Sequence, residues 1–321
     1  MEARTAGPGP HRLAVVTAGA TFGLIFVGGL VTTTGSGLAV PDWPLAFGQV
    51  FPRMEGGVLY EHGHRLVAAA VGGLTLALAA WLWACEPRAW VRGLGLAAAV
   101  GVVVQGLLGG ATVLLGLPLA VSILHAGLAQ AFFCVPVTLA LVTGSRWTET
   151  RSVERAPSTP GLHRLCLSLT VLVYLQILLG AVMRHLGAGL AIPDFPLALG
   201  RVIPPLDAWP VAVHFAHRVG AAAGTVAVLW TVARILRRRE VPGLVVPACL
   251  ALALLGAQLA LGALTVWTVK AVVPTTAHVA GGAALLATCL VLTFRTTASA
   301  RAHQARPAPR AAAFARRRSA A

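Results

Sequence analysis

The sequence carries very little charge for its length. Only 11% of its 321 residues are Asp, Glu, Lys or Arg, whereas 57% are apolar. Soluble domains contain roughly a quarter charged residues, so this deficit excludes an ordinary soluble globular protein. The mean hydropathy of +0.80 points the same way. The composition therefore predicts a chain that lies in a lipid bilayer.

Cysteine is also scarce, and its placement excludes two kinds of site. None of the five cysteines belongs to a CxxC pair or stands in an outer loop, so neither a CxxC metal or redox motif nor a disulfide-stapled loop is expected. We interpret these residues as small packing groups within or beside apolar segments: Cys85, Cys134, Cys166, Cys249 and Cys289.

The apolar residues gather in eight runs. Crossing a bilayer takes about 20 residues at a rise of about 1.5 Å each, and all eight runs reach that length. The first is too long for a signal peptide and lacks its cleavage site. We predict an all-α integral membrane protein with eight transmembrane helices near 12–34, 62–84, 94–116, 119–143, 162–184, 211–236, 244–269 and 272–295.

The formal net charge of +15 is unevenly distributed along the chain. If the N-terminus is cytoplasmic, 19 of the 25 basic residues flank the inner ends of the helices. The positive-inside rule therefore predicts a multi-pass protein with both termini in the cytoplasm. The inner basic patches suit anionic lipid. Because no base-reading or stacking module accompanies them, we expect no nucleic-acid partner.

An internal repeat organises the chain. Residues 35–48 are echoed by residues 187–200 at an offset of 152, and further matches fall at an offset of 153. These are His64-Arg65 with His217-Arg218, Gln105 with Gln258, and His125 with His278. We interpret the chain as a tandem duplication of a four-helix unit. Because four is even, the two four-helix bundles should be parallel repeats, related by an axis along the membrane normal.

This repeat divides the chain into five parts. They are a cytoplasmic N-terminus (1–11), an N-terminal half (12–143), a cytoplasmic linker (144–161), a C-terminal half (162–295) and a disordered, basic cytoplasmic tail (296–321). The outer loops, about 35–60 and 185–210, each carry a Pro-Asp-aromatic-Pro motif. Two interpretations stay open for them: an ordered cover over a site, or a purely structural cap.

Four histidines stand at equivalent places near the outer ends of alternate helices: His64, His125, His217 and His278. Ionisable residues inside membrane segments are functional candidates by default. Two neutral imidazoles facing each other across a bundle suit a haem iron, so we predict that all four ligate iron. Zinc fits less well, because a two-histidine site needs further ligands and only Glu61, His62 and His214 are near.

Two more features accompany the histidines. Arg65 and Arg218 follow their histidines directly, and they can pair with haem propionates or extend to lipid headgroups. Glu61 is equivalent to His214, so the two halves differ at this point. A carboxylate beside one haem can move protons or stabilise a cation, although the helix dipole alone favours an acid at a helix start. The asymmetry suggests that one half performs chemistry while the other holds a cofactor.

These motifs together resemble the haem A synthase family of cytochrome oxidase assembly. The resemblance rests on residues 35–44, the Glu61-x-x-His64-Arg65 element, His125, His217-Arg218 and His278, and it covers about residues 12–295. It implies oxidation of the C8 methyl of haem O to a formyl group, which gives haem A for terminal oxidases. Two successive oxygenations would form a geminal diol that loses water.

The resemblance also implies roles by position. His217 and His278 would ligate a retained haem b, His64 and His125 would line or ligate the haem O site, and Glu61 would be the essential acid. It further implies a bacterial inner (plasma) membrane, haem O synthase as the substrate donor, an electron donor that the sequence does not identify, and room for a homo-oligomer.

The chain departs from its family in one respect. Many bacterial members carry a cysteine pair in the first outer loop, but this chain has Val40 and Ala46 there, and Ile192 and Ala198 in the second loop. No loop disulfide can form, which puts a thiol-based role in doubt.

Two rival functions remain. A dihaem b-type membrane electron carrier, without substrate oxidation, would use the same four histidines. The Glu61/His214 difference and the loop motif favour the enzyme, because a pure carrier could keep both halves alike. A parallel-repeat transporter would need broken helices at mid-membrane depth. No paired Gly/Pro interruption occurs there, although Pro136 alone can kink its helix.

Overall fold

The computed structural model describes residues 8–145, 147, 160–238 and 243–304. Eight of its helices are long and apolar enough to cross a membrane, which confirms the predicted all-α membrane fold. They are α1 (Pro8–Thr33), α2 (Gly56–Cys85), α3 (Ala89–Leu114), α4 (Leu119–Thr143), α6 (Pro160–His185), α7 (Trp209–Arg238), α8 (Val245–Trp267) and α9 (Val272–Gln304); a short 3-10 helix, η1, spans Ala188–Leu190.

Two helix boundaries differ from the prediction and change where predicted residues lie. Helix α2 begins at Gly56 rather than near 62, because no proline follows Pro52 and the backbone hydrogen bonds can start earlier. Glu61 therefore lies in the second turn and not at the helix start. Helix α9 runs on to Gln304, so the prediction of disorder from 296 is wrong up to that residue; an alanine-rich segment without proline before Pro307 favours helix.

Several predicted segments lie wholly or partly outside the described residues. These are the first seven residues of the N-terminus, most of the linker (146 and 148–159) and the remainder of the tail (305–321).

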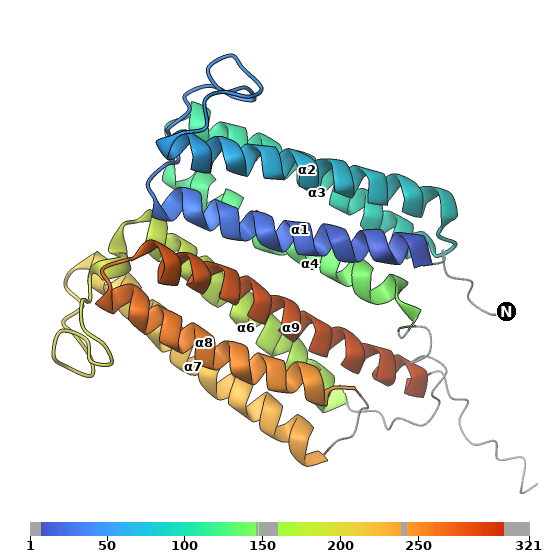
Figure 1. Ribbon diagram of the computed structural model, residues 1–321. Helices are drawn as coiled ribbons and strands as arrows, with labels where there is room; N and C mark the ends of the chain where they lie inside the picture. Colours follow the sequence, from blue (N-terminus) through green and yellow to red (C-terminus); the bar gives the residue numbers. More distant parts are fainter. Residues whose placement is uncertain (1–7, 146, 148–159, 239–242, 305–321) are drawn as a thin grey trace, which may run out of the picture.

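The helices of each half form a four-sided bundle. Helix α1 packs on α2 and α4, and α3 packs on α2 and α4, so α2 and α4 stand on one diagonal. Helices α6, α7, α8 and α9 repeat this pattern with α7 and α9 on the diagonal. Figure 1 shows the two groups side by side. The helices that carry the predicted histidine pairs therefore face each other across each bundle.

The two halves meet through their first and last helices. Helix α1 packs on α9, and α6 packs on α4. In each case the first helix of one half meets the last helix of the other. Helices α4 and α9 also pack on each other between the halves. Half of the α4 and α9 spans is buried, against 11–33% of the other spans. A small cluster of Ile25, Phe133 and Ala283 seals this junction. The pattern supports two related halves, while the symmetry axis along the membrane normal stays a prediction.

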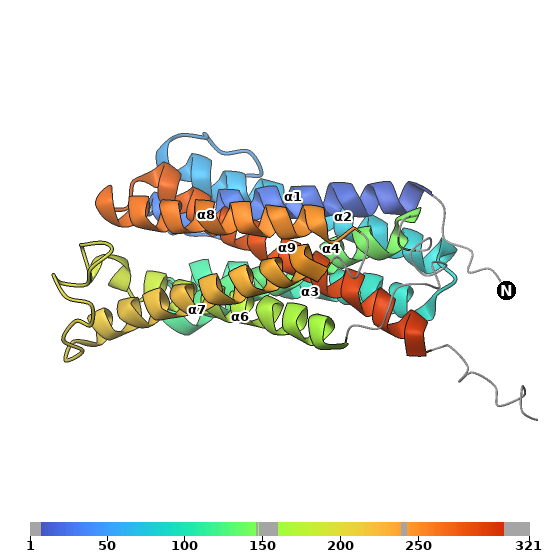
Figure 2. The same ribbon diagram turned by 90° about the horizontal axis from the view of Figure 1, so that it is seen from below.

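Both long loops, 34–55 and 186–208, lie at one end of the molecule. Pro8, where α1 begins, and Gln304, where α9 ends, lie at the opposite end (Figures 1 and 2). The two halves thus enter in the same sense. We call the loop end the outer end and the opposite end the inner end, following the predicted topology.

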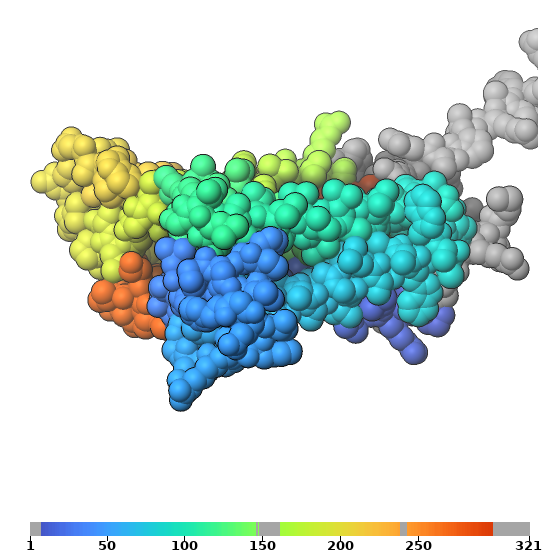
Figure 3. Space-filling model, turned by 90° about the horizontal axis from the view of Figure 1, so that it is seen from above, coloured from blue at the N-terminus to red at the C-terminus, as the bar shows by residue number. Residues whose placement is uncertain are grey.

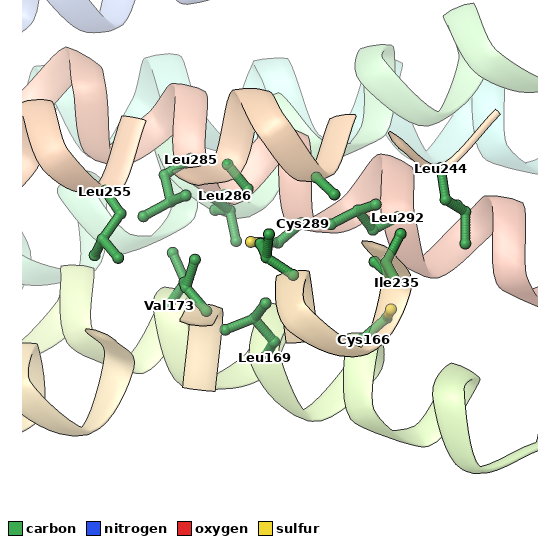
Figure 4. Close-up of a cluster of buried hydrophobic side chains, with 14 of the residues drawn as sticks. Cys166, Leu169, Val173, Ile235, Leu244, Leu255, Leu285, Leu286, Cys289 and Leu292 are labelled. Atoms are coloured by element: carbon green, nitrogen blue, oxygen red, sulfur yellow. The ribbon is translucent and has the colours of Figure 1, made fainter. Parts of the chain in front are cut away.

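The hydrophobic cores fill only the inner part of each bundle. In the second half the core combines the first half of α6, the start of α8, the late turns of α7 and the middle turns of α9. Figure 4 shows Cys166 of α6, Leu244 just before α8 and Leu292 of α9. The first half has the matching cluster, including Leu78, Leu82 and Leu139. Among the described residues, no such cluster fills the outer part of either bundle.

The cysteines follow the packing interpretation only in part. Cys166 and Cys289 are buried in the second core and Cys134 packs against it. Cys85 and Cys249 lie exposed on the helix surfaces, so the interpretation is wrong for these two.

Candidate functional site

The four predicted histidines occupy matching positions in the outer part of the bundles. His64 and His217 stand eight residues after the starts of α2 and α7, and His125 and His278 stand six residues after the starts of α4 and α9. At about 1.5 Å per residue these positions lie roughly 9–12 Å along their helices. Within each half the two histidines lie on the two diagonal helices at similar depth. The structure thus places each predicted pair at one level of one bundle.

Each imidazole rests against a glycine of a neighbouring helix. A Cβ added at that glycine would stand only 3.0–3.3 Å from the histidine Cε1, so only glycine lets the ring lie this close to the helix backbone. We call these residues the seat glycines: Gly28 for His64, Gly109 for His125, Gly180 for His217 and Gly262 for His278. Sequence reasoning missed them, although their offsets of 152 and 153 match the repeat.

The histidine nitrogens fit a planar iron-bearing ligand. The Nδ1 atoms of His64, His125 and His278 are buried without a hydrogen-bond partner, whereas Nδ1 of His217 meets Gln176 at 3.1 Å. Unpaired buried polar atoms are costly, and three of them at repeat-related positions need an explanation. Paired imidazoles, seated on glycines and above a core that stops short of them, are what a haem site between helices requires.

Other metal arrangements find less support. Within the described part of the chain, no three His, Cys, Asp or Glu side chains gather into a metal-holding group. A tetrahedral zinc site needs more protein ligands than a histidine pair supplies. Two cavities, of about 200 and about 430 Å³, are lined by inner-end residues such as Trp83 and Arg295, away from the histidines.

The outer loops share one internal turn. The Asp42 carboxylate accepts the N–H groups of Phe47 (2.7 Å) and Gly48 (2.8 Å), and Asp194 does the same in the second loop. Phe47 and Gly48 both have positive φ, the requirement of a type I′ turn. Hydrogen bonds from Gly48 and Phe47 lower the pKa of Asp42. The repeated motif therefore encodes an ordered turn, and Figure 3 shows the first loop as a blue projection.

Arg65 binds the first loop. Its guanidinium donates to the carbonyls of Asp42 (2.6 Å), Leu45 (2.8 Å) and Val40 (3.1 Å). Arg218 repeats this on the second loop, donating to the carbonyls of Asp194 (2.7 Å), Leu197 (2.8 Å) and Ile192 (3.0 Å). Both groups hold a loop against a helix and do not extend to headgroups. Their contact with haem propionates stays a prediction.

Glu61 and His214 hold the same point of their loops. Glu61 is 3% exposed; its Oε2 accepts the Val40 N–H at 2.9 Å and its Oε1 pairs with Arg65 at 2.6 Å. His214, also 3% exposed, accepts the Ile192 N–H on Nδ1 at 3.3 Å. Glu61 is therefore not simply an acid at a helix start that the dipole favours. The two halves differ here in charge, not in architecture.

Comparison with known proteins adds an independent finding. Residues 11–290 match the family model described as cytochrome oxidase assembly protein. The haem A synthase of Symbiobacterium thermophilum is 40% identical over 245 residues, covering 74% of this chain and 79% of that protein. The haem A synthase of Shouchella clausii is 32% identical over 272 residues, covering 82% and 88%. That of Alkalihalophilus pseudofirmus is 32% identical over 237 residues, covering 70% and 77%.

Proposed function

Because the chain belongs to the family of cytochrome oxidase assembly proteins, we propose that it acts as a haem A synthase, an oxidoreductase of a bacterial membrane that converts haem O to haem A. The C8 methyl of haem O becomes a formyl group in two oxygenation steps. The observation that carries the proposal is the pair of imidazoles across each bundle, at matching positions and on glycine seats.

We assign the retained cofactor to the second half. His217 and His278 would hold haem b there, and bound haem b would supply a path for single electrons. Both imidazoles sit in a bundle whose inner core is closed by Leu255, Leu285 and their neighbours. That core would keep the far side of the cofactor dry. The equivalent of Glu61 in this half is His214, so that position carries an imidazole in place of the carboxylate.

We assign the substrate to the first half, where His64 and His125 would orient haem O. The loop above them supports the interpretation as an ordered cover. The ring of Trp43 packs closely on α3. A Cβ added at Gly110 of that helix would lie only 2.7 Å from the Trp43 ring. Gly110 directly follows Gly109, the seat of His125. Trp43 therefore covers the helix face next to that histidine and would exclude water from the reacting end of the substrate.

Glu61 holds this cover in place. Its two oxygens are both occupied by donors, from Val40 and Arg65. In this arrangement the carboxylate stabilises positive charge and orders the loop. Each oxygen keeps a second lone pair and can still accept a proton. Protonation would neutralise the carboxylate and weaken its pair with Arg65, which links proton transfer by Glu61 to loosening of the cover.

Mass analysis of extracted haems tests the function. With a source of haem O, we expect the wild-type protein to yield haem A. His64→Ala and Glu61→Ala should abolish haem A while retaining haem b, and His217→Ala or His278→Ala should lose the retained haem b. A dihaem electron carrier gives a different result: two fixed haem b groups and haem O left unchanged. That result would overturn the proposal.

We also propose that both termini are cytoplasmic. The uneven distribution of 19 of 25 basic residues supports this, as does the position of the start of α1 and the end of α9 opposite the loops. Haem O synthase as the donor of substrate and assembly into a homo-oligomer belong to the same proposal.

A further inference from the structure

Each seat glycine is preceded, four residues earlier and one turn inward, by a position that the proposed function leaves without a role. Four residues make about one helical turn, so that side chain lies on the same face of the helix as the seat. Three of the four positions hold glutamine, namely Gln105, Gln176 and Gln258, and the fourth holds Leu24. Leu24 belongs to the seat of His64.

Two of the three glutamines donate hydrogen bonds to the helix turn that carries the histidine, and Gln258 Nε2 is buried without a hydrogen-bond partner. Gln176 Nε2 donates to the main-chain carbonyl of His217 at 2.8 Å and meets its Nδ1 at 3.1 Å. Gln105 Nε2 donates to the main-chain carbonyl of His125 at 2.9 Å. These contacts tie the turns of His217 and His125 to the helices on which their rings are seated.

Glycine makes room for the glutamine side chains in the second half. A Cβ at Gly220, three residues after His217, would stand 2.1 Å from Gln176 Oε1. A Cβ at Gly281, three residues after His278, would stand 2.1 Å from Gln258 Nε2. Neither position can therefore carry a larger side chain while the glutamine stays in place. Both histidines of the second half have a glutamine and a matching glycine.

His64 lacks both parts of this arrangement. Leu24 replaces the glutamine and Val67 replaces the glycine at the position equivalent to Gly220. Leu24 packs against the inner core of the first half. The Nδ1 atom of His64 is buried without a hydrogen-bond partner, as are those of His125 and His278. What sets His64 apart is that its ring is seated on Gly28 with no glutamine one turn inward from that seat.

A residue that holds the helix turn of an iron ligand affects how well iron is bound. Outer-shell partners of this kind fix the orientation of a ligating histidine, and their loss typically costs about 10–100-fold in metal affinity. A glutamine Nε2 has two hydrogens to donate, so one side chain can hold the main chain of the histidine turn.

We propose that Gln105, Gln176 and Gln258 are positioning residues for their histidines, and that Leu24 and Val67 leave His64 as the labile iron ligand. This inference rests on the proposed function. In the second half both histidines then have a glutamine beside their helix turn, with Gly220 or Gly281 making room for it. A haem in the first half is held through His125 and opens on the side of His64, the side that bears Glu61. The duplicated bundle thus has a permanent site and an exchangeable site.

Haem exchange in the full-length holoprotein tests this. The first measurement is transfer of the retained haem to an excess of soluble apo-haem acceptor. Gln176→Leu should speed this transfer about 10–100-fold. Gln130→Leu is the matched control, since Gln130 is a buried glutamine of α4 that belongs to no seat. Equal transfer rates in both variants and the wild type would overturn the role of Gln176.

The second measurement uses cyanide binding to ferric haem O loaded into the first half. The wild type should bind cyanide rapidly there, and the double variant Leu24→Gln/Val67→Gly should bind it about tenfold or more slowly. Leu24→Met is the control for repacking and should resemble the wild type. A double variant that loads haem O but binds cyanide at the wild-type rate would overturn the proposal for His64. Neither measurement needs turnover, so absent haem A would refute the proposed function without deciding this inference.

Discussion

Replacing Gly180 by alanine should loosen the retained haem. The added Cβ would stand 3.0 Å from Cε1 and 3.5 Å from Nδ1 of His217. Carbon atoms prefer about 3.5–4.0 Å, so the ring must move by roughly 0.5 Å or more. Iron–ligand distances tolerate only about 0.2 Å. The shift would also strain the contact of His217 with Gln176. We therefore expect a loss of haem affinity of about 10–100-fold.

The assay is the haem-to-protein ratio of the purified protein, with the absorption spectrum of the reduced haem as a second readout. Gly224→Ala is the matched control, because it makes the same change in the same half and a Cβ there meets nothing within 4 Å. Gly180→Ala should lose haem and show an altered spectrum, whereas Gly224→Ala should match the wild type. Equal haem content and equal spectra in the two variants would refute the role assigned to the seat glycines.

Three further predictions follow from the same contacts. Gly28→Ala should reduce haem A formation with haem b retained, whereas Gly23→Ala, which meets nothing within 4 Å, should not; product analysis separates them. The N–H groups of Gly48 and Phe47 lower the pKa of Asp42 from its ordinary value of 3.8. The hydrogen bonds of this turn should therefore be at full strength above pH 3.8 and should weaken as the pH falls through the lower pKa that Asp42 has in the folded protein. Asp42→Asn should show fast hydrogen exchange at residues 46–49 already at neutral pH; exchange equal to wild type would contradict this. Arg218→Ala should release the second loop and make residues 186–208 the first site of limited proteolysis, whereas an unchanged cleavage pattern would show that the three carbonyl contacts are dispensable.

Much of the fold follows from features that can be read along the chain. Eight apolar runs give eight helices, because burial of backbone polar groups in lipid leaves the helix as the form a span can take. The offset of 152 or 153 pairs each histidine with its counterpart, since a duplication conserves spacing whatever the tertiary packing. Helix ends were less accurate, as α2 and α9 show, because they depend on where the hydrogen-bonded turns stop.

The partners of the polar side chains could not be predicted in this way. Arg65 lies beside His64 in the sequence, which suggested a shared ligand, yet its guanidinium binds the carbonyls of the first loop. Glu61 was expected at a helix start, yet it is buried under Val40. These contacts depend on the path of the loop back over the helix, and hydropathy contains no information about that path.

The sequence by itself determined that this is a duplicated, eight-helix membrane protein with four equivalent histidines, because hydropathy and repeat spacing are properties of the linear chain. Only the tertiary structure decided what supports each imidazole. The seat glycines and their glutamines lie on other helices, 36 to 41 residues from His64 and His217 and 16 to 20 from His125 and His278. Which faces of two helices meet depends on their rotation and packing, and these are fixed only when the whole bundle assembles.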